Sequence, residues 1–160
     1  MSLTEKRNRF AQTLKQNYLP LNSTITISTV IKEERSTIWK LWNEPDHITK
    51  WNFAADDWCC PSAENDLRVG GKLKSRMEAK DGSFGFDFEG TYDEIIDQKK
   101  ITYTIADGRQ VTTDFEDLDN DTKITTTFEA EAENSIEIQR DGWQAILNNF
   151  KKYVENADEN

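Results

Sequence analysis

The chain has 160 residues, with 20 Lys and Arg against 30 Asp and Glu, a formal net charge of −10 and a pI near 4.6. This length suits one domain, and five Trp, four Tyr and eight Phe supply material for a core although only 36% of the residues are hydrophobic. The acidic balance argues against binding to nucleic acid or to an anionic membrane surface, because both need a basic protein surface.

The charge is distributed unevenly along the chain. Residues 1–22 carry four basic residues and one acidic residue, a net charge of +3, so the remainder carries −13. Within this arm, Leu3, Phe10, Leu14 and Tyr18 recur at intervals of seven and four, which predicts an amphipathic helix. Two interpretations stay open. The basic face is solvated, or it docks on an acidic surface of its own chain or of a second subunit, which would make a homodimer.

The first part of the main domain is expected to contain one strand and two short helices. Alternation of apolar and polar residues predicts a strand over 24–31. An apolar face predicts a helix over 34–43, and a proline at the first position of 45–51 begins another. Residues 53–71, which include Pro61 and two adjacent glycines, are expected to be irregular.

The two cysteines and the one histidine lie in or near this region. Cys59 and Cys60 are adjacent, and sequence neighbours rarely form a disulfide. Together with His47 they cannot complete a four-ligand zinc site. No run of about 18 apolar residues and no apolar signal-peptide core occurs. We therefore predict reduced thiols, a cytoplasmic location, no membrane insertion, no metal and no cofactor, with a redox role of the cysteine pair as the alternative.

A series of strands follows and ends in one long helix. Alternation predicts strands over residues 72–78, 84–93, 100–105, 109–117 and 122–130. Asp-Gly pairs at 81–82 and 107–108 are typical of hairpin turns. An apolar stripe at helical spacing predicts a helix from Ser135, its expected cap, to about residue 156, with a frayed tail over 155–160. Gly142 within this helix suggests a close approach to another element or to a ligand.

Such an antiparallel sheet needs a cover on one face, and the last helix is the only element long enough to provide it. We expect the sheet to curve around that helix and to leave a cavity bordered by the short helices and by residues 53–71. Side chains along a strand point alternately to the two faces of the sheet. If Phe86 and Phe88 point inward, the residues with the same parity form an apolar inner face that carries hydroxyl groups and no charge. A fully packed core without a pocket is the alternative. The candidate ligand-pocket residues are Trp51, Phe53, Trp58, Met77, Phe86, Phe88, Tyr103, Thr113, Trp143 and Leu147.

Charged residues are expected to stay outside this pocket. The same parity places Asp87, Glu89 and Asp93 on the outer face of the sheet, and it places Arg76 and Arg109 outside the pocket as well. A general base, if the protein is an enzyme, would have to be His47 or a carboxylate near the mouth of the cavity, such as Asp56 or Asp57. No catalytic motif is present, so the catalytic residues stay unknown.

Several short motifs occur together in a characteristic order. They are Ile38-Trp39, Pro45, Trp51, Asp66-Leu67-Arg68-Val69-Gly70-Gly71-Lys72-Leu73, Asp81-Gly82, Phe88-Glu89-Gly90-Thr91-Tyr92-Asp93-Glu94-Ile95, and Gly142-Trp143 with Leu147. Over residues 23–154 the chain resembles the family of activators of heat-shock protein 90 ATPase homologues. That family belongs to the helix-grip superfamily, with START lipid-transfer domains, birch-pollen-allergen-like proteins and polyketide cyclases.

The resemblance implies an α+β fold in which a curved antiparallel sheet of about seven strands grips the long C-terminal helix around an apolar pocket. The expected function is the binding of a small hydrophobic or aromatic molecule. Two alternatives stay open. One is an enzyme of the polyketide cyclase or hydrolase type that uses the same pocket. The other is a regulator of a chaperone ATPase or another protein-interaction module, although the eukaryotic activators carry a large N-terminal domain that these 160 residues do not contain.

Overall fold

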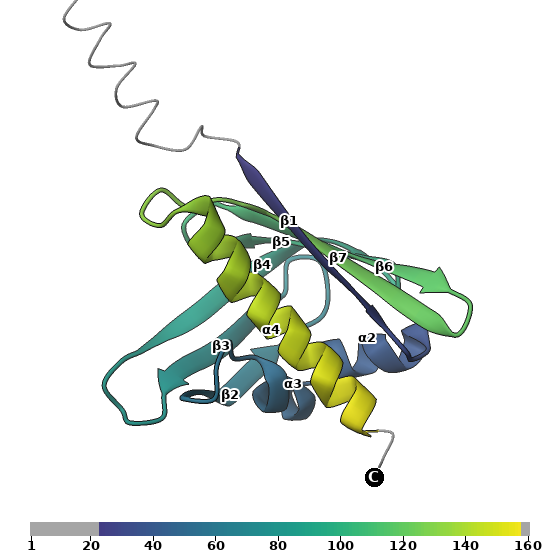
Figure 1. Ribbon diagram of the computed structural model, residues 1–160. Helices are drawn as coiled ribbons and strands as arrows, with labels where there is room; N and C mark the ends of the chain where they lie inside the picture. Colours follow the sequence, from purple (N-terminus) through teal and green to yellow (C-terminus); the bar gives the residue numbers. More distant parts are fainter. Residues whose placement is uncertain (1–22, 158–160) are drawn as a thin grey trace, which may run out of the picture.

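The computed structural model describes residues 23–157, so the predicted N-terminal helix and any dimer contact within 1–22 lie outside the described residues. Seven antiparallel strands form one sheet in the order β1-β7-β6-β5-β4-β3-β2, which curls around the long helix α4 (Figure 1). This confirms the predicted α+β architecture. The elements are β1 (Thr24–Ile31), α2 (Arg35–Asn43), α3 (Pro45–Trp51), β2 (Trp58–Asn65), β3 (Lys72–Ala79), β4 (Gly85–Ile96), β5 (Lys100–Ile105), β6 (Gln110–Leu118), β7 (Asp121–Glu129) and α4 (Ile136–Ala157).

Strand β2 corrects the prediction that residues 53–71 are irregular. It lies at the edge of the sheet and pairs with β3 alone. The register of this pairing shifts between Cys59 and Ser62, at the position of Pro61. Proline has no N–H to donate, and an edge strand with a bulge accommodates it without losing a ladder bond. The proline therefore marks an irregularity within a strand and not the absence of one.

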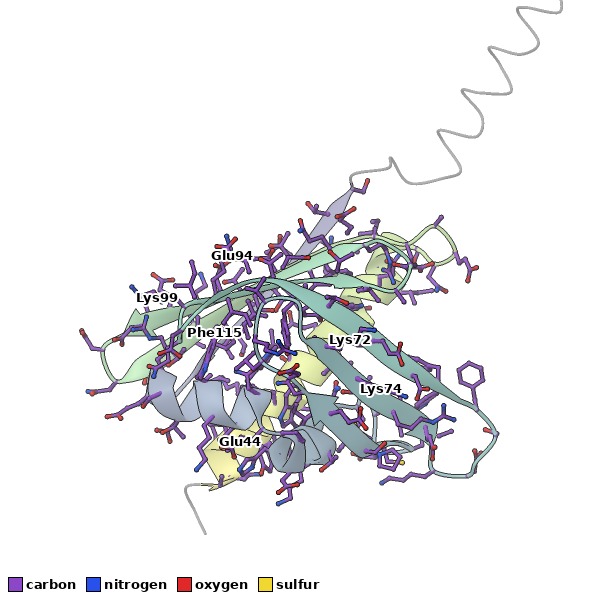
Figure 2. The ribbon with its side chains drawn as sticks, turned by 180° about the vertical axis from the view of Figure 1, so that it is seen from behind. Glu44, Lys72, Lys74, Glu94, Lys99 and Phe115 are labelled. Carbon is purple, nitrogen blue, oxygen red and sulfur yellow. The ribbon has the colours of Figure 1, made fainter. Side chains whose placement is uncertain are left out.

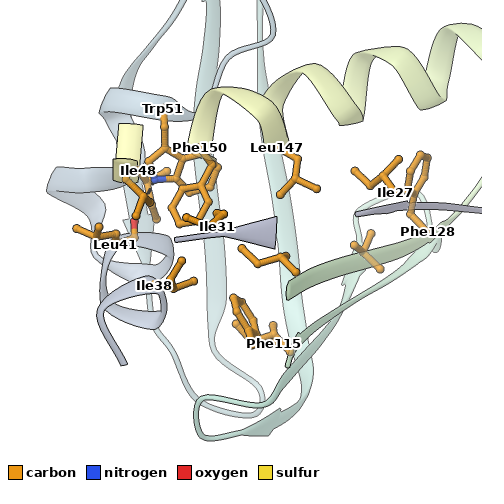
Figure 3. Close-up of a cluster of buried hydrophobic side chains, with 14 of the residues drawn as sticks. Ile27, Ile31, Ile38, Leu41, Ile48, Trp51, Phe115, Phe128, Leu147 and Phe150 are labelled. Atoms are coloured by element: carbon orange, nitrogen blue, oxygen red, sulfur yellow. Dashed lines mark hydrogen bonds between the residues drawn. The ribbon is translucent and has the colours of Figure 1, made fainter. Parts of the chain in front are cut away.

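The two short helices close one end of the curled sheet. Figure 3 shows Leu41 of α2, Ile48 and Trp51 of α3, and Phe150 of α4 gathered there. The indole Nε1 of Trp51 donates a hydrogen bond to the carbonyl of Leu41 at 3.0 Å. Its ring meets Phe150 edge to face at 4.8 Å and stacks on Trp42 at 5.0 Å. These contacts fix the two short helices against α4, so that their side chains form one end of the interior.

Helix α4 lies along β1 and spans the concave side of the sheet (Figure 1). The hydroxyl of Ser135 accepts a hydrogen bond from the Ile138 N–H at 3.1 Å, as its predicted capping role requires. The helix continues to Ala157, and residues 158–160 of the expected frayed tail lie outside the described residues. A methyl group added at Gly142 would meet nothing within 4 Å, which contradicts the expected close approach at this position.

The outer face of the sheet carries the charged residues. Figure 2 shows this face, with Lys74 on β3. Lys74 lies 3.6 Å from a carboxylate oxygen of Glu89 and 3.8 Å from one of Asp87, and Arg76 contacts both Glu78 and Asp87. The expectation that Asp87 and Glu89 point outward is correct. Each carboxylate has a cationic neighbour, so they form a solvated ion-pair network and not an acid–base pair.

Candidate functional site

A cavity of about 340 Å³ lies between the inner face of the sheet and the helices. Eight of the ten residues predicted for the pocket line it. The full lining is Ile27, Trp42, Asn43, Ile48, Trp51, Asn52, Glu64, Asn65, Leu73, Ser75, Met77, Phe86, Phe88, Tyr92, Ile101, Tyr103, Arg109, Thr113, Thr126, Trp143, Ile146 and Leu147. Most of these side chains are apolar, so the walls suit a molecule with an apolar body.

Phe53 and Trp58 are the two predicted pocket residues that do not line the cavity. Phe53 lies beyond the end of α3 and packs against the core from outside the cavity wall. The ring of Trp58 lies 6.0 Å from Phe84 and 6.3 Å from Phe86, at the tip of the β3–β4 hairpin. Phe84 is 60% exposed, whereas Trp58 is half-buried and also packs against the core. Neither side chain therefore lines the cavity that their segments were expected to border.

Hydroxyl groups on the inner face mostly bond to one another. Thr113 on β6 and Thr126 on β7 are paired across the two strands, and their Oγ1 atoms lie 2.9 Å apart. Tyr92 on β4 donates its hydroxyl hydrogen to Oδ1 of Asn65 on β2. The Nδ2 of Asn65 in turn donates to the carbonyl of Asn43 at 2.7 Å. Each of these groups has a hydrogen-bond partner within the protein, and all of them line the cavity.

Asn65 is a lining residue that the sequence analysis missed. It is the last residue of β2, the strand that was predicted to be irregular. Its amide ties β2 to Tyr92 on β4 and to the end of α2 at Asn43. Burial raises the pKa of the Tyr92 hydroxyl, and the hydrogen bond to Asn65 partly offsets this effect. Residues 58–65 show no regular alternation around Pro61, so the sequence carried no clear signal for Asn65.

Tyr103 on β5 presents a hydroxyl that is still free to bond. Its ring meets the rings of Phe88 and Tyr92 edge to face, at 6.2 Å and 6.3 Å. Gly90 on β4 pairs with Ile105 and lies diagonally across from Tyr103. It makes room for this ring, because a Cβ there would lie 2.8 Å from Cδ2 of Tyr103. Burial strongly raises the pKa of the Tyr103 hydroxyl, Tyr92 adds to this effect, and the charge of Arg109 opposes it. Among the described residues, this hydroxyl has no hydrogen-bond partner.

Arg109 lines the cavity, which overturns the expectation that it stays outside. It directly precedes β6 and shares the parity of Val111 and Thr113, whose side chains are buried on the inner face. Its Nε donates to a carboxylate oxygen of Asp107 at 2.8 Å, and its Nη1 donates to the carbonyl of Glu129 at 3.2 Å. Arg76 remains on the outer face as predicted. The cavity therefore combines apolar walls with one guanidinium group.

The candidate general bases do not reach the cavity. His47 lies on α3 with Nδ1 2.6 Å from the hydroxyl of Tyr153 and Nε2 3.5 Å from a carboxylate oxygen of Glu44. Neither His47 nor the exposed Asp56 and Asp57 line the cavity. Among the described residues that line it, Glu64 is the one carboxylate.

The adjacent cysteines are free thiols. Cys60 is 2% exposed, and burial raises the pKa of its thiol, which disfavours the reactive thiolate. Within residues 23–157, no three His, Cys, Asp or Glu side chains come together as metal ligands would. In the same part of the chain, no helix is long and apolar enough to cross a membrane.

Comparisons with known proteins agree on one family. Residues 32–155 match the family described as Activator of Hsp90 ATPase homolog 1-like protein. The structure is similar to that of an AHSA1-like protein from Aeromonas hydrophila, with 40% identity, a TM-score of 0.81, and coverage of 85% of this chain and 94% of that one. A Cytophaga hutchinsonii protein is 46% identical with a TM-score of 0.73, and the same shares of the two chains are covered.

More distant structures share the fold alone. A protein from Nitrosomonas europaea is 14% identical with a TM-score of 0.73, and the match covers 86% of this chain and 97% of that one. No protein of curated function matches this chain.

Proposed function

The chain belongs to the Activator of Hsp90 ATPase homolog 1-like family, and on this basis we propose that it binds a small hydrophobic or aromatic molecule in the cavity beneath α4. The observation that carries the proposal is the cavity itself. Its volume of about 340 Å³ falls within the range of small-molecule sites, and its walls are mainly apolar with a few polar groups. Such a composition provides affinity through burial and orientation through a small number of hydrogen bonds.

Aromatic rings at one end of the cavity support a flat ligand. Trp143 of α4 meets Phe88 edge to face at 6.0 Å, and Phe88 meets Tyr103 in the same way at 6.2 Å. All three residues line the cavity. Ring edges and faces arranged in this way offer both stacked and edge-to-face contacts to an aromatic molecule.

A neutral fluorescent probe, N-phenyl-1-naphthylamine, tests the proposal. We expect saturable binding of one probe per chain, with increased emission. Ile146 lines the cavity from α4, so Ile146→Trp should fill the space and abolish binding. Ile138 lies on the same helix but is 62% exposed and outside the cavity, so Ile138→Trp is the matched control and should bind normally. Absence of binding, or equal binding by the two variants, would refute the proposal.

We extend the proposal to the compartment in which the protein acts. The free thiols of Cys59 and Cys60 support a reducing, cytoplasmic location, because adjacent thiols remain reduced there. Modification of both thiols in protein purified anaerobically, measured by mass spectrometry after denaturation, would support this assignment. Recovery of the pair in an oxidised state would count against it.

A further inference from the structure

We infer that the ligand is uncharged and carries a carbonyl oxygen, which accepts hydrogen bonds from Arg109 and Tyr103 at one end of the cavity. This inference rests on the proposed function, because it names the class of molecule that the same cavity takes.

The first support is the unpaired hydroxyl of Tyr103. The other inner-face hydroxyls of Tyr92, Thr113 and Thr126 all have partners within the protein. The Tyr103 hydroxyl has none among the described residues, and its half-buried side chain lines the cavity. An O–H donor that faces a cavity needs an acceptor there, and a ligand oxygen within reach would supply one. Tyr103 is therefore the natural polar contact for an occupant.

The second support is the unused donor capacity of Arg109. Nε is bonded to Asp107 and Nη1 to the carbonyl of Glu129, while Nη2 has no hydrogen bond to any residue from 23 to 157. A guanidinium group has only donors, so its partner in the cavity must be an acceptor. Tyr103 pairs with Val111 across β5 and β6, and Arg109 lies two residues before Val111, so Arg109 and Tyr103 are diagonal neighbours on the same face. An oxygen with two lone pairs can accept from both groups.

The third support concerns charge, and it distinguishes a carbonyl from a carboxylate. The positive charge of Arg109 is already balanced by Asp107, at 2.8 Å. Despite slight burial, hydrogen bonds from Glu133 and Asn134 and the charge of Arg109 lower the pKa of Glu131, so a second carboxylate is ionised near the guanidinium. An anionic ligand would lose its hydration in the cavity and would be repelled by these carboxylates. The charge of Arg109 is already balanced, so it would not compensate for this cost. A neutral acceptor avoids this cost.

Three probes of nearly the same shape test the inference: 2-acetylnaphthalene, 2-isopropylnaphthalene and 2-naphthoate. Each is titrated against bound N-phenyl-1-naphthylamine at pH 7.5, and the displacement gives its affinity. We expect the ketone to bind about tenfold more tightly than the hydrocarbon, the difference typical of one hydrogen bond to a charged donor, and the carboxylate to bind most weakly.

Matched variants assign the preference to the two residues. Tyr103→Phe and Arg109→Gln should each reduce the ratio of ketone to hydrocarbon affinity several-fold. Tyr153→Phe and Arg76→Gln change the same residue types outside the cavity and should leave the ratio unchanged. The hydrocarbon affinity of each variant reports whether the cavity itself is intact.

The outcomes separate this inference from the proposed function. Equal binding of ketone and hydrocarbon, tightest binding of 2-naphthoate, or a ratio unchanged in both Tyr103→Phe and Arg109→Gln would overturn the inference and leave the proposed function standing. Failure of the wild-type protein to bind N-phenyl-1-naphthylamine or any of the three probes would overturn both.

Discussion

Phe128 on β7 and Trp143 on α4 stack nearly face to face, with ring centroids 4.1 Å apart and an interplanar angle of 13°. Trp143 also meets Phe88 of β4 at 6.0 Å, so one side chain links the helix to two strands that are not neighbours in the sheet. The stack fixes the N-terminal half of α4 over the sheet. The cavity thus depends on this contact for one of its walls.

Replacing Trp143 with alanine should lower the free energy of unfolding by about 2–3 kcal/mol, because a large, mostly buried ring is lost and leaves a void. Urea denaturation followed by far-UV circular dichroism measures this change without relying on tryptophan emission. Trp58→Ala is the comparison: its ring is also half-buried, but it contacts the exposed Phe84 and Phe86, so its loss should cost less, about 1–2 kcal/mol. Equal losses in the two variants would show that the stack has no special role.

The two cavity tyrosines should respond in opposite ways to the loss of their hydroxyl groups. Tyr92→Phe leaves Oδ1 of Asn65 without its donor and should cost about 1–2 kcal/mol of stability. Tyr103→Phe removes a hydroxyl that has no partner among the described residues, so stability should be unchanged or slightly higher. Chemical denaturation of both variants tests the contrast. A large loss in Tyr103→Phe would mean that its hydroxyl is bonded within the protein.

The regular elements were predictable because their periodicity is strong. Strand β4 alternates without interruption around Phe86 and Phe88, and α4 carries a stripe with a capping serine at its start. Strand β2 was missed because Pro61 and the register shift beside it interrupt the alternation. Asn65 was missed for the same reason. An alternating sequence pattern predicts local backbone geometry. Whether a strand tolerates proline depends on whether it lies at the edge of the sheet, which local sequence does not specify.

The candidate site was predicted less completely than the fold. The alternation along four strands correctly placed residues such as Met77 and Thr113 on the inner face. The expected position of the segments that hold Phe53 and Trp58 did not predict which way these two side chains point. Arg109 is different, because it lies two residues before Val111, which was correctly placed inside, and yet its parity was assigned to the outside. The signal was present in the sequence. The ion pair of Arg109 with Asp107 offsets the free-energy cost of turning the charged guanidinium inward, and only the structure reveals this pair.

The buried tyrosines should make the fold sensitive to alkaline pH. Burial raises the pKa values of Tyr92 and Tyr103 above the ordinary value of about 10. Their neutral forms are thus favoured in the folded state, so the stability they contribute is complete below pH 10 and is lost as the pH rises above it. The expected slope is about 1.4 kcal/mol per pH unit for each tyrosine. Urea denaturation between pH 9 and pH 11 measures it.

Tyr103→Phe isolates one of these contributions. Lysine titration affects the wild type and the variant alike, so the difference in stability between them should grow in favour of the variant as the pH rises above 10. A difference that stays constant from pH 9 to pH 11 would show that Tyr103 titrates equally in the folded and unfolded states, contrary to its enclosed position.

Two glycines should respond to alanine in opposite directions. At Gly142 in α4 the added methyl group meets nothing within 4 Å, so Gly142→Ala should raise the free energy of unfolding by about 0.5–1 kcal/mol through helix propensity alone. At Gly90 the new Cβ would lie 2.8 Å from the ring of Tyr103. That ring is flanked by Phe88 and Tyr92, so it cannot move freely, and Gly90→Ala should cost about 1–3 kcal/mol. Thermal and urea denaturation of both variants measure the two changes. Stabilisation by Gly90→Ala would show that the Tyr103 ring moves easily, and would also weaken its assignment as a fixed donor in the cavity.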